Sequence, residues 1–184
     1  QDLNTPVAKA LVRRLYGESL TLARNDGILP IRGADTLRIG SLVIGDSLNN
    51  GLQQAVGRYA KVIDLNCDKI LNADQSQAML DSLKQFDLVI ASVHNTSSNV
   101  QKEFGVPQLT LDFLRRLGNQ QRMAFVLFAN LYRLGMAFGA QRWNAMLIAY
   151  EETDDTEDLA AQLLFGAIPA KGRLPVTASS YFAF

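Results

Sequence analysis

The spacing of hydrophobic positions changes along the chain, from a helical period near the start to short continuous apolar runs further on. Residues 6–22 carry Ala8, Leu11 and Leu15 at helical spacing, which predicts an amphipathic helix. Thr5 suits the N-cap of this helix, because a threonine hydroxyl accepts a hydrogen bond from a free N–H of the first turn. An Asp-Gly pair then marks a turn before the second part of the chain begins.

From residue 37 onward, apolar runs alternate with segments of helical spacing. The apolar runs predict strands at residues 37–45, 61–65, 87–93, 123–129 and 145–150, with a candidate edge strand at 174–177. The intervening segments predict helices at residues 47–58, 74–85, 110–117 and 154–165. Several runs are apolar on both faces, as buried parallel strands are. The pattern therefore predicts an α/β fold, a three-layer α/β/α sandwich with a mainly parallel sheet of five or six strands.

Local signals predict where two of these helices begin and end. Asp154 precedes the last apolar helix and suits its N-cap, and Glu157 is spaced to reach back as the partner in a capping box. Gly118 follows the helix at residues 110–117 and is predicted to end it.

The domain organisation follows from the same change of pattern. Residues 37–184 form one predicted sandwich domain, and residues 1–36 form a lead-in helix and linker. The chain begins with glutamine rather than methionine, so we expect it to be a processed or excised part of a longer protein.

Composition excludes several classes of partner and chemistry. Eighteen basic residues balance eighteen acidic ones, which removes the electrostatic argument for nucleic acid or an anionic membrane surface. No apolar run is long enough to insert into a membrane as a spanning helix. Cys67 and His94 are the single cysteine and the single histidine, so multi-cysteine metal sites and most catalytic triads are excluded. The nucleotide-binding glycine motifs are absent, and we expect no cofactor and no metal.

Polar side chains follow two predicted strands at the edge where open α/β sheets place ligands. The candidate binding residues are His94, Asn95, Ser97, Ser98 and Asn99 after the strand at 87–93, and Arg133 after the strand at 123–129. Their functional interpretation is a loop that faces a ligand. The alternative is a solvated connection whose serine and asparagine side chains cap a turn.

Two further residues invite a catalytic role. Glu103 is the one carboxylate in residues 93–107, so it is the candidate acid/base, although its surroundings fit an ordinary exposed turn equally well. Cys67 suggests a cysteine hydrolase with His94 as base, but it lacks a glycine-rich elbow and an orienting partner, which favours a structural thiol.

Three stretches together resemble glycoside hydrolase family 3, specifically its C-terminal α/β domain. They are Glu18-Ser-Leu-Thr-Leu-Ala-Arg-Asn-Asp-Gly-Ile-Leu-Pro-Ile, Val126-Leu-Phe-Ala-Asn-Leu-Tyr-Arg-Leu, and the segment from Ala149-Tyr-Glu to Lys171-Gly-Arg-Leu-Pro-Val-Thr. In the second stretch Ala129 and Leu131 stand where the family more commonly has Gly and Pro. Residues 67–108 carry little of the resemblance.

The resemblance implies a parent protein with an N-terminal (β/α)₈ catalytic barrel that carries the nucleophilic aspartate. This chain is then an accessory domain that docks on the barrel, lines the sugar cleft and is inactive alone. The family's glucosidase-like members place a Glu-Gly-x-x-Asp-Arg pattern in the loop after the third strand, and residues 93–107 lack it. We therefore expect the β-N-acetylglucosaminidase-like subgroup, acting on carbohydrate. Family members are often exported, which implies a periplasmic or extracytoplasmic parent. The alternative function is a flavodoxin-like module that binds a small molecule or nucleotide.

Overall fold

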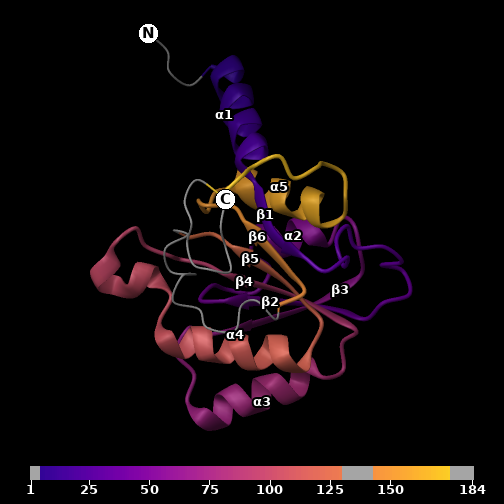
Figure 1. Ribbon diagram of the computed structural model, residues 1–184, viewed down its shortest axis with the longest axis vertical. Helices are drawn as coiled ribbons and strands as arrows, with labels where there is room; N and C mark the ends of the chain where they lie inside the picture. Colours follow the sequence, from indigo (N-terminus) through magenta and orange to yellow (C-terminus); the bar gives the residue numbers. More distant parts are fainter. Residues whose placement is uncertain (1–4, 130–142, 175–184) are drawn as a thin grey trace.

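The computed structural model describes residues 5–129 and 143–174. Six strands form one sheet in the spatial order β1-β6-β5-β4-β2-β3. The strands are β1 (Thr21–Asn25), β2 (Ile39–Ile44), β3 (Val62–Cys67), β4 (Leu88–Val93), β5 (Met123–Leu127) and β6 (Ala145–Ile148). All neighbouring pairs are parallel except β1 and β6, which run antiparallel. The predicted mainly parallel sheet is confirmed (Figure 1).

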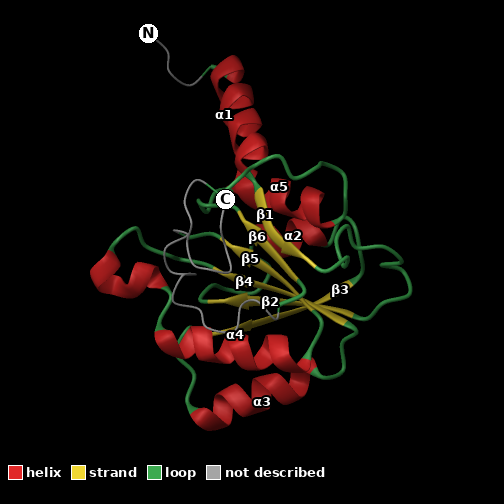
Figure 2. Cartoon of the chain, viewed as in Figure 1, coloured by secondary structure: helices red, strands yellow, loops and turns green. Residues whose placement is uncertain are grey.

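Helices cover both faces of the sheet and complete the predicted α/β/α sandwich (Figure 2). The helices are α1 (Pro6–Ser19), α2 (Gly51–Val56), α3 (Ala73–Leu83), α4 (Gln108–Gln120) and α5 (Asp154–Leu164), with a short 3₁₀ segment η1 (Val100–Gly105). α3 and α4 lie on one face, while α2 and α5 pack together on the other. Each face therefore has its own apolar core, one around Phe125 and Trp143 and the other around Phe128 and Leu164.

Strand β1 is the largest departure from the prediction, which placed only a helix and a linker before residue 37. It pairs with β6 from Thr21↔Ile148 to Asn25↔Ala145 and forms one edge of the sheet. Its sequence, Thr-Leu-Ala-Arg-Asn, is not a continuous apolar run, so the segment carries a weak strand signal. Residues 1–36 thus contribute a strand to the sandwich. The domain boundary between residues 36 and 37 stays a prediction. The candidate edge strand at 174–177 lies almost wholly outside the described residues.

The structure corrects the predicted N-terminus of α5. Thr153, not Asp154, is the N-cap, and Thr156 is its partner in the capping box, with Thr156 N–H donating to Thr153 Oγ1 at 3.2 Å. Glu157 therefore does not reach back to the cap. The one-residue shift turns Glu157 inward, where it is 7% exposed. The sequence allowed either cap, since threonine and aspartate both serve.

Gly118 was also misassigned, because α4 continues past it to Gln120. A Cβ at this position would collide with the indole ring of Trp143. Glycine is therefore required here by close packing inside a helix and not by a turn. The prediction that Thr5 caps α1 is confirmed, with Ala8 N–H donating to Thr5 Oγ1 at 3.1 Å.

Candidate functional site

A cleft of about 1130 Å³ opens at the carboxyl edge of the sheet. The chain passes from β2 to β3 on one side and then returns to β4 on the other side of β2, so the strand order reverses between β2 and β4. In open α/β sheets, the loops leaving the two strands at such a reversal diverge and leave a crevice where ligands bind. Asp46 and Asn50 come from the segment after β2, and Asn95 follows β4. The cleft is therefore where the topology predicts a site.

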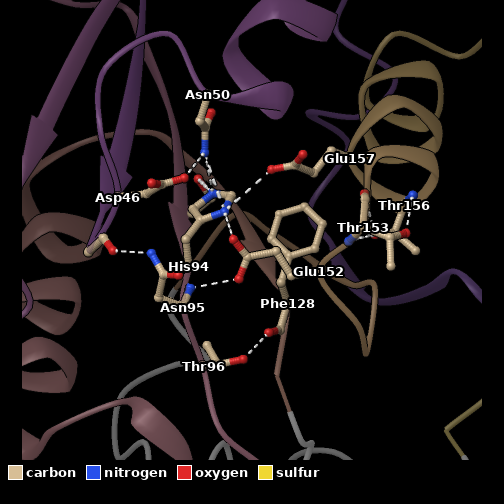
Figure 3. Close-up of polar contacts among 12 residues, drawn as sticks. Asp46, Asn50, His94, Asn95, Thr96, Phe128, Glu152, Thr153, Thr156 and Glu157 are labelled. Atoms are coloured by element: carbon tan, nitrogen blue, oxygen red, sulfur yellow. Dashed lines mark hydrogen bonds and ion pairs between the residues drawn. The ribbon is translucent and has the colours of Figure 1, made fainter.

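His94 lies directly beneath this cleft and is fully buried. Its Nδ1 is 3.0 Å from Glu152 Oε1, and its Nε2 is 2.8 Å from Ser92 Oγ. The Phe128 ring covers one side of the imidazole at a centroid distance of 5.0 Å (Figure 3). Both ring nitrogens of His94 therefore have a hydrogen-bond partner, Glu152 at Nδ1 and Ser92 at Nε2.

Glu152 connects the ends of two strands through its two oxygens. While Oε1 contacts His94, Oε2 accepts a 2.6 Å hydrogen bond from the backbone N–H of Asn95. Asn95 in turn donates from Nδ2 to Gly45 O at 2.7 Å and has a left-handed backbone with φ of 52°. The segment after β4 is thus tied both to the end of β6 and to the end of β2.

A second carboxylate, Glu157, approaches the same imidazole from α5. Its Oε1 lies 3.5 Å from His94 Nδ1, and only 9% of its side chain is exposed. Burial raises the pKa of Glu157 above its ordinary value, and the neighbouring His94 opposes part of this effect. The sequence prediction missed Glu157 because it assigned the residue to a helix cap.

The structure brings most of the predicted polar loop into the cleft. Asn95, Ser97 and Ser98 line it, whereas His94 lies under its floor. Asn99 is not among the lining residues and instead accepts a hydrogen bond from Gln101 N–H at 2.8 Å, as the cap of η1. Arg133 lies outside the described residues. The predicted loop therefore divides into cleft-facing, buried and capping residues, and its binding role stays a prediction.

Glu103, the candidate acid/base, lies elsewhere. It is exposed on η1 and is not among the residues that line the cleft. Its backbone is left-handed, with φ of 52°. Its catalytic role stays a prediction, and the geometry does not favour it.

Sequence reasoning missed several residues that build the cleft. The cleft is also lined by Asp46, Asn50, Phe128 and Glu152, and none of them was among the predicted site residues. The signal was present, because each of these residues follows the carboxyl end of a strand. The same edge rule that selected the loop after β4 would have found them after β2, β5 and β6.

Carboxylates dominate the chemistry of the described cleft lining. Asp46, Glu151, Glu152, Asp154 and Glu157 line it, and no lysine or arginine appears among its described residues. Such a surface offers many hydrogen-bond acceptors for hydroxyl groups. It disfavours phosphate, because like charges repel, and so it does not fit the alternative of a nucleotide-binding module.

Asp46, His94 and Glu152 also offer oxygen or nitrogen atoms within 4.8 Å of one another, close enough to hold a metal ion. A metal bound at Nδ1 would have to displace the contact between His94 and Glu152, and Nε2 already contacts Ser92. The described geometry is a hydrogen-bonded network, in which His94 holds other groups in place.

Cys67 does not take part in the site. It lies at the end of β3 with intermediate exposure and packs against the core on the α3 and α4 face. Burial, with a smaller contribution from Asp68, raises the pKa of its thiol to about 12. The thiolate needed for nucleophilic attack is therefore disfavoured, which argues against the cysteine-hydrolase hypothesis.

Comparison with known proteins gives both sequence and fold similarity. The chain is 27% identical to β-hexosaminidase A of Pseudoalteromonas piscicida over 95% of its length, which is 33% of that protein. The fold matches a glycoside hydrolase family 3 β-N-acetylglucosaminidase from Paenibacillus sp. str. FPU-7 with a TM-score of 0.74, at 16% identity, over 97% of this chain and 34% of that one. It also matches a β-glucosidase from Erythrobacter marinus with a TM-score of 0.67, at 16% identity, over 95% of this chain and 30% of that one. No family model matches the chain.

The fold and the switch-point cleft define a doubly wound α/β domain. Within that class, the chain is similar to part of a β-hexosaminidase and shares its fold with glycoside hydrolase family 3 β-N-acetylglucosaminidases, which supports a C-terminal α/β domain of that type. The chain spans about a third of the length of these relatives. In the described residues, no helix has the length and apolar character that a membrane span requires.

Proposed function

We propose that this chain is the accessory domain of a parent glycoside hydrolase that cleaves β-N-acetylglucosaminides, docked on an N-terminal (β/α)₈ catalytic barrel. The observation that carries the proposal is the alignment of almost the whole chain with one third of a β-hexosaminidase. The remaining two thirds leave room for a catalytic domain of the size a (β/α)₈ barrel needs.

The cleft at the carboxyl edge is the part of this chain that suits carbohydrate. Asn95, Ser97 and Ser98 supply amide and hydroxyl groups, and the carboxylates around them accept hydrogen bonds from sugar hydroxyls. His94 is fully buried and so acts on this surface through Glu152 and Asn95, as a positioning residue. We propose that this surface forms one wall of the parent's sugar cleft.

The choice of N-acetylglucosaminide over glucoside rests on the sequence. The segment from β4 to α4 lacks the Glu-Gly-x-x-Asp-Arg pattern, and its carboxylate Glu103 lies outside the described cleft lining. A retaining glycosidase needs a proton donor about 5–5.5 Å from its nucleophile, so a parent with this domain would draw that group from the barrel. The β-hexosaminidase relative supports the same choice.

Hydrolysis of a chromogenic β-N-acetylglucosaminide tests the proposal. We expect turnover by the parent polypeptide and none by the 184-residue chain. A chromogenic β-glucoside, assayed in parallel, is the control for sugar specificity. Turnover by the chain alone would contradict the accessory role, and a parent that cleaves only the glucoside would contradict the assigned sugar.

A further inference from the structure

Helix α1 leaves a group of apolar side chains exposed on the side that faces away from its own domain. A surface helix normally turns its apolar side toward the core and its polar side toward water. None of the residues of α1 is buried, and its side chains at Val7, Leu11, Val12 and Leu15 are 78%, 47%, 44% and 57% exposed. At 3.6 residues per turn, these four positions share one arc of about 140°.

The opposite side of α1 holds the helix to its own domain through polar contacts. Arg13 forms ion pairs with Asp155, at 2.6 Å, and with Asp158, both on α5. The Tyr16 hydroxyl donates to Glu151 Oε2 at 2.8 Å. The apolar face therefore points away from the sandwich, and the N-terminal part of α1 extends beyond it (Figure 1).

This arrangement is not what a solvated helix needs. A 14-residue helix gains little stability in water from its backbone alone, and most of its stability comes from burying an apolar face. Contiguous exposed apolar residues on a soluble domain mark an interaction site. The apolar face of α1 thus fits a partner outside this domain.

We infer that the α1 face, defined as Val7, Leu11, Val12 and Leu15, docks on an apolar patch of the parent's catalytic domain, and this inference rests on the proposed function. The relatives are about three times as long as this chain, so the domain that covers the α1 face can belong to the same polypeptide. Lys9 and Arg14 flank the face, and both are exposed. Glu18 lies on the same side and pairs with Lys171 at 2.6 Å, so the charges around the face have both signs and the patch on the partner is defined by its apolar centre.

The test compares the parent polypeptide with the 184-residue chain, each carrying Leu11→Glu together with Leu15→Glu. Leu109→Glu on α4 is the matched control, because Leu109 is a helical leucine of similar exposure, 53%. Amide hydrogen exchange of α1 should be at least about tenfold slower in the unmodified parent than in the chain alone. In the parent, the double substitution should abolish that protection and lower the melting temperature. In the 184-residue chain, it should leave the melting temperature unchanged. Leu109→Glu should change neither the exchange of α1 nor the difference between parent and chain.

Equal exchange of α1 in parent and chain would overturn the inference. So would a dimer of the 184-residue chain that the double substitution dissociates in sedimentation velocity, because the occupant would then be a second copy. Failure of the proposed function is separate: it would appear as a parent without glycosidase turnover, whatever the exchange of α1.

Discussion

At the scale of single residues, the site depends on one buried imidazole and the two carboxylates beside it. Glu152 satisfies His94 Nδ1–H and Asn95 N–H simultaneously, so it is the residue through which β6 and β4 hold the cleft wall. Glu157 is placed against the same ring but is less well solvated. We therefore expect substitutions of Glu152 and Glu157 to affect stability in different ways.

Glu152→Ala should lower the free energy of unfolding by about 1–3 kcal/mol, because it leaves two donors without their acceptor, one of them on a fully buried ring. Urea denaturation measures this change. Glu151→Gln is the control, since its contact with Tyr16 is exposed and should contribute within about 0.5 kcal/mol. Equal losses for the two variants would mean that the His94 network does not stabilise the fold.

Glu157→Gln tests the effect of burial through its pH dependence. Because the pKa of Glu157 is raised in the folded state, the unfolded chain ionises first as pH rises above the ordinary value of 4.5, and folding is then disfavoured. The variant lacks this penalty, so its stability relative to the unmodified chain should increase as pH rises from below 4.5 toward neutral. Denaturation at several pH values measures the difference. A difference that stays flat with pH would contradict the assignment.

At the scale of elements, two helical glycines differ in the room that their surroundings leave for a side chain. Gly118 in α4 lies against Trp143, whose Nε1 would be 2.7 Å from an added Cβ. Gly17 in α1 has more room, since an added Cβ would meet Leu159 Cδ2 at an ordinary 3.7 Å. Local helix propensity treats the two positions alike, so only packing distinguishes them.

Gly118→Ala should therefore destabilise the protein by about 1–3 kcal/mol, because overpacking outweighs the gain in helix propensity. Gly17→Ala should stabilise it by about 0.5–1 kcal/mol, because nothing opposes that gain. Thermal denaturation of the two variants measures both signs. Stabilisation by Gly118→Ala would show that Trp143 moves away at little cost.

At the scale of the whole molecule, one prediction concerns the source of the proton donor in the proposed parent enzyme. Glu103 is exposed on η1 and outside the described lining of the cleft, so we expect Glu103→Ala to lower the parent's kcat/KM by less than tenfold. General acid–base groups contribute about 10²–10⁴-fold. Steady-state kinetics on an N-acetylglucosaminide measures the loss, and a loss of a hundredfold or more would restore Glu103 as the acid/base.

The sequence by itself determined the layered α/β class, because continuous apolar runs such as residues 87–93 leave few other ways to bury both faces of a strand. It also located the cleft edge, since the loop from His94 follows such a run. Tertiary structure alone decided that β1 joins the sheet, because its pairing with β6 joins residues more than 100 positions apart. It likewise decided that Glu152 and Glu157 meet His94, and that Gly118 faces Trp143. These are contacts between segments that lie far apart in the sequence. Local propensity carries no information about which distant side chains will be in contact.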